Sequence, residues 1–269
     1  AMEAAHRAAE DAKEKGFVQI NISDPIEDNI SLEEKLCKKY NLDVVKIAYS
    51  PLNTSSEIKK SISMKAAEYL YEIAKDGDII GVSWGTTIYK MALNLKHKAL
   101  KGVQIVQLKG GISHSQNNTY AYEVVELFSE AFSTVGRYLP LPVMFDTVQI
   151  KELIERDKHI RNILDLGRQA NIAVFTVGTV KDDALLFRLG YIDEKDREII
   201  QKKAAGDICS RFFDLNGNIC DKDLDERTVG IKLEELKEKE KRILVAGSQR
   251  KITAIEASLR GGFANILVT

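Results

Sequence analysis

The sequence predicts an α/β fold with a Rossmann-like, mostly parallel sheet flanked by helices. Short apolar runs alternate with amphipathic helices along the chain, and no repeat or low-complexity tract interrupts them. Several of these runs end in glycine beside polar residues, as at Gly110, Gly178 and Gly247. Ligands bind outside the carboxyl ends of the strands in open parallel sheets. We therefore expect a crevice where these strands end.

The composition is that of an ordinary globular protein with room for one large domain or two small ones. The 269 residues are 44% hydrophobic and 29% charged, with a net charge of −1, so nothing attracts the whole chain to nucleic acid or anionic membrane. The sequence shows no signal peptide and no long apolar span. Three scattered cysteines, Cys37, Cys209 and Cys220, favour a reducing cytoplasm. The histidine spacing predicts no metal site, and the glycine motifs predict no nucleotide cofactor.

In the amino-terminal half, residues 4–15 read as a charged helix that Gly16 ends, and alternation over 17–22 predicts a strand. The capping-box spacing of residues 31–34 predicts the start of a helix whose apolar face continues to residue 41. The remaining predicted elements are strands at 44–48, after Asp78 and at 103–108, and helices at 55–73, 87–95 and 122–136.

In the carboxyl-terminal half, two prolines mark residues 139–146 as extended, and one charged helix is predicted at 151–169. The pattern changes between residues 194 and 226, which suggests a smaller inserted α/β portion. The mixed charges of residues 234–241 are typical of a solvated helix face. The other predicted elements are strands at 172–178, 243–247 and 264–268, helices at 194–205 and 251–259, and a turn at 215–217.

The turn after Asp78 is the candidate phosphate site. Glycines there let the backbone approach an anion, and hydroxyls lie beside the free N–H groups of a helix start. The residues concerned are Gly81, Ser83, Gly85, Thr86 and Thr87. Trp84 within the turn would stack on a ligand or pack under the loop. The alternative is a plain βα turn in which a threonine is the helix cap.

Lys109 follows an apolar run and precedes two glycines, so we expect it at the carboxyl end of a strand. Burial there disfavours the charged form, and a neutral amine attacks an aldehyde to form a Schiff base. The alternative is an exposed lysine at a strand exit.

Four further residues are candidates for ligand contacts. Asp207 would bind sugar hydroxyls or cap a turn, and Lys251 at a helix start would bind phosphate or be solvated. Thr176 and Gly178 would present a hydroxyl and a backbone edge to a sugar, or serve only β packing.

Four ordered motifs resemble the effector-binding domain of SorC-family bacterial transcriptional regulators. They are Gly81-Val-Ser-Trp-Gly-Thr-Thr, the Val-Gln-Leu-x-Gly-Gly at 106–111, Gly206-Asp-Ile-Cys-Ser-Arg-Phe-Phe-Asp, and the Ala-Gly-x-x-x-Lys pattern that begins at Ala246. The resemblance covers the chain from about Gly16 onward. It implies a sugar-phosphate isomerase-like fold that binds a phosphorylated sugar and changes how an oligomer holds its operator.

The resemblance implies that the turn from Ser83 to Thr87 corresponds to the phosphate site of the family. Thr176, Gly178, Asp207 and Lys251 match positions that line the ligand crevice. Lys109 departs from the family pattern, which usually has a small or polar residue there. A deoxyribose-5-phosphate effector, whose open form is an aldehyde, would explain the departure.

The resemblance also implies the domain organisation and the partners. We expect residues 1–16 to be the hinge helix to a missing DNA-binding domain, and residues 17–269 to be the effector-binding domain. We expect a homo-oligomer, dimer or tetramer, that contacts operator DNA only through the missing domain and releases it when the effector binds. Two alternatives remain: an isomerase or aldolase-like enzyme with Asp146 or Asp207 as general base, and a plain oligomerisation module.

Overall fold

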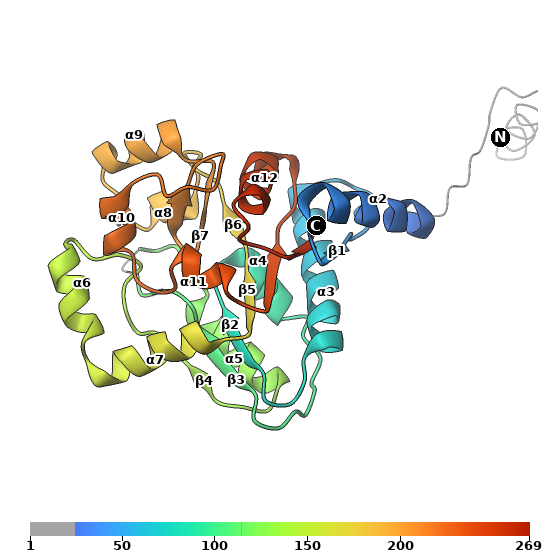
Figure 1. Cartoon of the computed structure of the whole chain (residues 1–269), viewed down its shortest axis with the longest axis horizontal. Helices are drawn as coiled ribbons and strands as arrows, with labels where there is room; N and C mark the ends of the chain where they lie inside the picture. Colours follow the sequence, from blue (N-terminus) through green and yellow to red (C-terminus); the bar gives the residue numbers. More distant parts are fainter. Residues whose placement is uncertain (1–24, 114) are drawn as a thin grey trace, which may run out of the picture. The chain divides into compact units, whose positions relative to one another are not determined.

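A seven-stranded sheet forms the centre of the fold. The computed structural model describes residues 25–113 and 115–269, and chain contacts group Glu33–Thr269 into one compact unit. Every neighbouring pair in the sheet is parallel, and the strand order is β1-β10-β9-β5-β2-β3-β4. Figure 1 labels β1 to β5 of this sheet. The strands are β1 (Val44–Lys46), β2 (Ile79–Val82), β3 (Gln104–Gln107), β4 (Gly136–Arg137), β5 (Ile172–Phe175), β9 (Lys241–Val245) and β10 (Ile266–Val268). The predicted parallel α/β class is confirmed.

The strand order reverses between β2 and β5. From β2 the chain moves outward through β3 to β4, and it then returns to the other side of β2 to form β5, followed by β9 and β10. The connections that leave the carboxyl ends of β2 and β5 therefore diverge. A topological switch point of this kind leaves a crevice at the sheet edge, where open α/β proteins bind their ligands.

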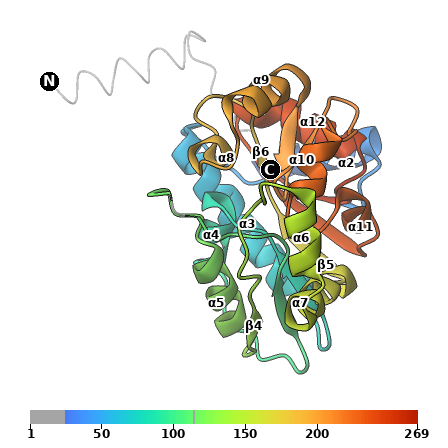
Figure 2. The ribbon, with the colours of Figure 1, turned by 90° about the vertical axis from the view of Figure 1, so that its left-hand side faces the viewer.

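Helices cover both faces of the sheet because its strands are apolar on both sides. Ile172 and Val174 of β5 pack with one core cluster, and Ala173 and Phe175 pack with another. The first face is covered by α3 (Ser55–Ile73), α4 (Thr86–Ala92) and α5 (Ala121–Ala131). Helices on the other face are α7 (Lys158–Gln169), α11 (Leu233–Lys237), α12 (Ile252–Arg260) and the last turns of α2 (Pro25–Tyr40). Figure 2 shows α4 and α5 on one side of β4 and α7 on the other.

A small antiparallel sheet makes up the separate portion that the sequence suggested. Its strands are β6 (Val177–Gly178), β7 (Gly206–Ile208) and β8 (Arg211–Phe213), in that order. Cys209 and Ser210 connect β7 to β8 with φ angles of 51° and 67°. The helices of this region are α8 (Leu185–Arg188), α9 (Glu194–Lys203) and α10 (Lys222–Arg227).

The predicted helix at 55–73 is confirmed as α3, but two predicted continuous elements are each divided. The prediction of one helix at 151–169 is wrong, because α6 (Val148–Glu155) and α7 are separate helices. Asp157 lies between them and caps α7 by accepting from the backbone N–H groups of His159 and Ile160. The prediction of one continuous strand at 172–178 is also wrong. The chain leaves the parallel sheet at Thr176 and enters the small sheet as β6.

Other boundaries also differ from the expectation. Helix α2 begins at Pro25 rather than Ser31, since proline is favourable at the first helical position. Helix α5 ends at Ala131, after which Ser133 takes a left-handed φ of 52° and Gly136 pairs with β3 as part of β4. A short 3₁₀ turn, η1 (Gln249–Lys251), precedes α12. The helix and strand predicted before residue 24 lie outside the described residues. Within the described ranges, no helix is both long enough and apolar enough to cross a membrane.

Candidate functional site

A cavity of about 460 Å³ lies at the carboxyl ends of β2, β3 and β5, at the switch point of the sheet. Its volume suits a small metabolite. The walls come from α3, the turn after β2, the end of β3, the small sheet, α8 and the turn before α12. A second cavity of about 520 Å³ is lined mainly by residues between 111 and 123, and no lysine or arginine is among its described lining residues.

The charges that line the first cavity favour an anion. Cations predominate over carboxylates among the lining residues, which include Lys59, Lys109, Arg188, Arg250 and Lys251 as against Asp183 and Asp207. Asp183 is occupied by Arg250, whose Nη2 donates to both carboxylate oxygens at 2.7 and 2.8 Å. In the described part of the chain, no cluster of three or more acidic, cysteine and histidine side chains could hold a metal ion.

The start of α4 and two lysines form one end of the cavity. Lys59 on α3 donates from Nζ to Thr86 Oγ1 at 2.9 Å, and Lys251 donates from Nζ to the carbonyl of Val177 at 2.7 Å. The pKa of Lys251 is lowered to about 8, mainly by burial; the charge of Asp207 opposes this effect, and the nearby charge of Lys59 adds to it. Burial also lowers the pKa of Lys59. An anion placed between these ammonium groups would relieve their repulsion.

The predicted phosphate turn divides into lining and supporting residues. Trp84, Gly85, Thr86 and Thr87 line the cavity, with Gly85 as the N-cap of α4. Gly81 lies within β2, where the side chain of Leu108 fills the space beside it, and Ser83 is buried. The backbone N–H of Ser83 donates to Val174 and so fixes the exit of β2 against β5.

Lys109 lies where β3 ends and is only 5% exposed. Its Nζ donates to Ser210 Oγ at 3.2 Å and lies 3.5 Å from the ring centroid of Trp84. Burial lowers the pKa of Lys109, and the charge of Asp207 partly opposes that effect. A desolvated amine of lowered pKa that faces a cavity can react with a carbonyl carbon.

Asp207 lies on β7, and the charges of both Lys109 and Lys251 act on it. Burial raises the pKa of its carboxyl group, whereas Lys109, Lys251 and the backbone N–H of Ser210, which donates to Oδ2 at 3.2 Å, lower it. Gly178 faces Asp207 across the β6–β7 pair, and a Cβ at position 178 would overlap Asp207 Oδ1. Gly178 therefore makes room for the carboxylate, a role that the sequence did not indicate. Thr176 also lines the cavity, and its Oγ1 has no hydrogen-bond partner in the described chain.

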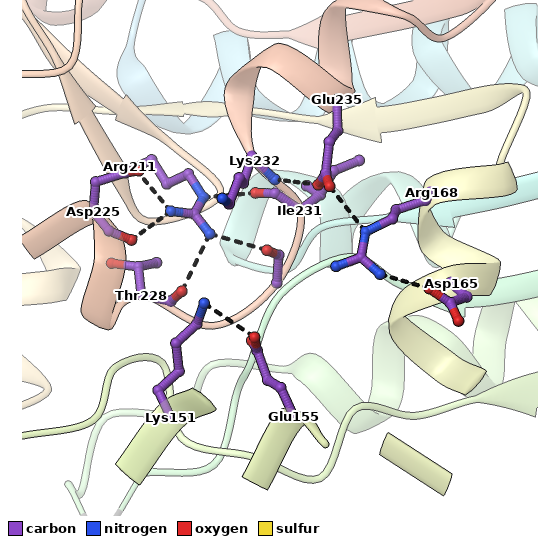
Figure 3. A network of polar contacts seen from close by, with 11 residues as sticks. Lys151, Glu155, Asp165, Arg168, Arg211, Asp225, Thr228, Ile231, Lys232 and Glu235 are labelled. Carbon is purple, nitrogen blue, oxygen red and sulfur yellow. Dashed lines mark hydrogen bonds and ion pairs between the residues drawn. The ribbon is translucent and has the colours of Figure 1, made fainter. Parts of the chain in front are cut away.

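Arg211 lies outside the cavity and fixes the backbone segment 225–231, which pairs with the end of β3. It is 1% exposed, and its guanidinium donates to the carbonyls of Asp225, Thr228, Gly230 and Ile231 and to Asp225 Oδ1 (Figure 3). The segment thus held pairs with the end of β3, since Ile231 N donates to the Leu108 carbonyl and Gly230 forms a β-bridge with Lys109. Residue 230 must be glycine, because its φ is 113° and a Cβ would strike the backbone of Leu108 and Lys109.

Sequence reasoning missed Lys59, Ser210, Arg211 and Arg250 as parts of the site. Ser210 and Arg211 belong to the family motif that begins at Gly206 and contains Asp207, so this motif could have indicated both residues. Lys59 lies on an ordinary amphipathic helix, where only the fold brings it to the cavity. Asp146 does not line this cavity, which removes one of the two general bases considered for an enzyme.

A family model described as "Putative sugar-binding domain" matches residues 24–269. This chain belongs to that family, the sugar-binding domain of SorC-type regulators. It is 53% identical to the "Deoxyribonucleoside regulator" of Bacillus subtilis over 257 residues, which cover 96% of this chain and 82% of that protein. The sequence-based assignment to the SorC family is confirmed.

Solved structures of regulators share the fold of this SorC-type domain. A transcriptional regulator from Streptococcus pneumoniae superposes with a TM-score of 0.84 at 26% identity, covering 91% of this chain and 94% of that one. The full-length sorbitol operon regulator SorC from Klebsiella pneumoniae has a TM-score of 0.81 at 24% identity, covering 99% and 86%. These relatives are named as transcriptional regulators and not as enzymes, so the regulator assignment stands.

Proposed function

We propose that this domain senses an aldehyde sugar phosphate, deoxyribose-5-phosphate in its open form, and binds it covalently through Lys109. The observation that carries the proposal is a desolvated lysine at the end of β3 that shares a cavity with the cationic groups of Lys59 and Lys251. Open-chain deoxyribose-5-phosphate has an aldehyde at one end and a phosphate at the other. The name of the Bacillus subtilis relative, a deoxyribonucleoside regulator, supports this class of effector.

The proposed reaction forms an imine. The neutral Nζ of Lys109 attacks the aldehyde carbon, a C–N bond forms and the carbonyl oxygen takes up a proton. The resulting carbinolamine then loses its hydroxyl group with a further proton as water, which leaves a protonated C=N bond. Counted from the ammonium form of Lys109, the only by-product is one water molecule. Asp207, whose charge acts on Lys109 and whose pKa burial raises, would hold the proton between these steps.

The phosphate would lie at the opposite end of the cavity. We assign it to the ammonium groups of Lys59 and Lys251 and to the hydroxyl and backbone N–H groups of Thr86 and Thr87. Thr176 and Asp207 remain for the sugar hydroxyls. The thiol of Cys209, next to Ser210, does not compete with Lys109 as nucleophile, because burial raises its pKa to about 11.

We further propose that this domain forms the homo-oligomer of a repressor and contacts operator DNA only through a separate DNA-binding domain. The effector would lower operator affinity, which requires that it bind the two states of the oligomer unequally. Calorimetric titration of operator-bound full-length regulator with deoxyribose-5-phosphate measures that difference. Equal effector affinity with and without operator would contradict this part of the proposal.

Borohydride trapping tests the covalent step. The domain is incubated with deoxyribose-5-phosphate, reduced, and weighed by intact-protein mass spectrometry. We expect one sugar-phosphate adduct in the wild type and none in Lys109→Met. Lys222→Met, which removes an exposed lysine on α10, should keep the adduct. If the wild type gives no adduct, the imine is wrong, and calorimetry with a panel of sugar phosphates then tests the non-covalent sensor by itself.

A further inference from the structure

The indole ring of Trp84 is fixed beside Lys109. Trp84 is 3% exposed, and its Nε1 donates to the carbonyl of Gly110, the residue after Lys109, at 2.8 Å. Its other contacts belong to an apolar cluster with Val143, Leu186 and Phe212. The hydrogen bond ties the ring to the same end of β3 that carries the lysine. The ring and the amine therefore keep their relative position.

The π face of this ring lies directly against the Lys109 nitrogen, whereas Asp207 acts on that nitrogen without forming an ion pair. Nζ lies 3.5 Å from the ring centroid, well inside the range of a cation–π interaction. Within the part of the chain that the structure describes, no carboxylate forms an ion pair with Lys109 inside 4.0 Å. The hydroxyl of Ser210 is a neutral acceptor at 3.2 Å. Such attraction acts on a cation and is nearly absent for a neutral amine.

We propose that Trp84 is the positioning residue that retains the covalent effector, because its ring stabilises the iminium ion on Lys109 and shields one face from water. This inference rests on the proposed function, since it presupposes the imine. The iminium carries its positive charge on the same nitrogen that lies over the ring in the free protein. Hydrolysis requires water to add to the iminium carbon, which discharges the nitrogen. The ring no longer attracts the nitrogen once its charge is lost, so Trp84 stabilises the iminium relative to the hydrolysis product and slows release of the effector.

This role differs from ligand stacking, the other function considered for Trp84. A ring that stacked on the sugar would contribute equally to binding with or without the imine. A ring that acts on the iminium contributes only when Lys109 has reacted. The two roles separate in a cycle that combines changes at Trp84 and Lys109.

The test measures how long the adduct survives. The domain is saturated with deoxyribose-5-phosphate and diluted into effector-free buffer, and aliquots are reduced with borohydride over time and weighed. We expect hydrolysis about tenfold faster in Trp84→Leu, and a smaller increase in Trp84→Phe, which keeps an aromatic face. Phe128→Leu removes a buried aromatic residue of α5 from a separate apolar cluster and should hydrolyse like the wild type. In a Lys109→Met background, Trp84→Leu should change the calorimetric affinity less than twofold.

Each outcome supports or overturns a defined part of the inference. Equal adduct lifetimes in the wild type and Trp84→Leu would overturn the role of Trp84 and leave the imine standing. A similar loss of affinity with and without Lys109 would also overturn it, in favour of stacking on the ligand. Absence of any adduct in the wild type would overturn the imine and this inference together. Thermal unfolding of each variant identifies changes that arise from loss of the fold.

Discussion

Gly178 and Asp207 face each other across the β6–β7 pair, and the carboxylate of Asp207 occupies the space that a side chain at position 178 would need. The charge of that carboxylate acts on two lysines of the cavity, the buried Lys109 and the half-buried Lys251. A backbone position without a side chain thus fixes the electrostatics of the site. Gly178, which the sequence suggested as a sugar contact, lines the cavity and also makes room for the carboxylate of Asp207.

Gly178→Ala should therefore displace Asp207. We expect a loss of about 2 kcal/mol in the free energy of unfolding from the overlap, together with a reduced yield of trapped adduct. Chemical denaturation and borohydride trapping measure the two effects. Gly167→Ala is the matched control, since a Cβ there meets only Leu108 at an ordinary distance of 3.7 Å within helix α7. The control should be neutral or stabilising by up to about 1 kcal/mol. An unchanged adduct in Gly178→Ala would mean that the position of Asp207 does not matter.

The sequence predicted the fold more completely than the site. Apolar periodicity is local, so the alternation of strands and helices along the chain and the extent of α3 could be read from it. The break at Thr176 could not, because the residues on both sides favour a strand. The contact of Trp84 with Lys109 depends on the register of β2 against β3. Lys59 reaches the cavity only because α3 packs on the sheet. Such relationships are tertiary and leave no pattern in one sequence.

Lys109→Met tests whether this lysine is retained for function or for stability. Methionine has a similar length and removes a cation that burial disfavours, so we expect the free energy of unfolding at pH 7 to be unchanged or raised by about 1 kcal/mol. A lysine whose folded pKa is lowered costs stability below that pKa, and the cost disappears as pH rises toward the unfolded value of 10.5. Any gain in the variant should therefore shrink at alkaline pH. A marked loss of stability at pH 7 would show that Lys109 is a structural residue.

Arg211 should be indispensable to the fold of the segment 225–231 that pairs with Leu108 and Lys109. Its guanidinium satisfies four backbone carbonyls and one carboxylate from a buried position, so Arg211→Met should cost about 3–5 kcal/mol in chemical denaturation. Lysine should not rescue the variant, because it lacks the planar fork of donors. Arg168→Met is the control: its side chain is 44% exposed and pairs with Asp165 and Glu235, so we expect a cost of about 1 kcal/mol or less. Comparable losses at the two positions would refute the supporting role of Arg211.

The affinity for the phosphate should fall as pH rises above about 8. Burial sets the pKa of Lys251 in the free protein to about 8, and a bound phosphate dianion favours its charged form. Below pH 8 the ammonium is already present, but above it each binding event must take up a proton, so affinity falls by up to about tenfold per pH unit. Calorimetry in the Lys109→Met background isolates this non-covalent part. In that background, Lys251→Met should bind the sugar phosphate more weakly at pH 7 and lose most of the fall in affinity above pH 8. Lys59, whose pKa burial also lowers, accounts for the pH dependence that remains. An unchanged slope without Lys251 would place the phosphate elsewhere in the cavity.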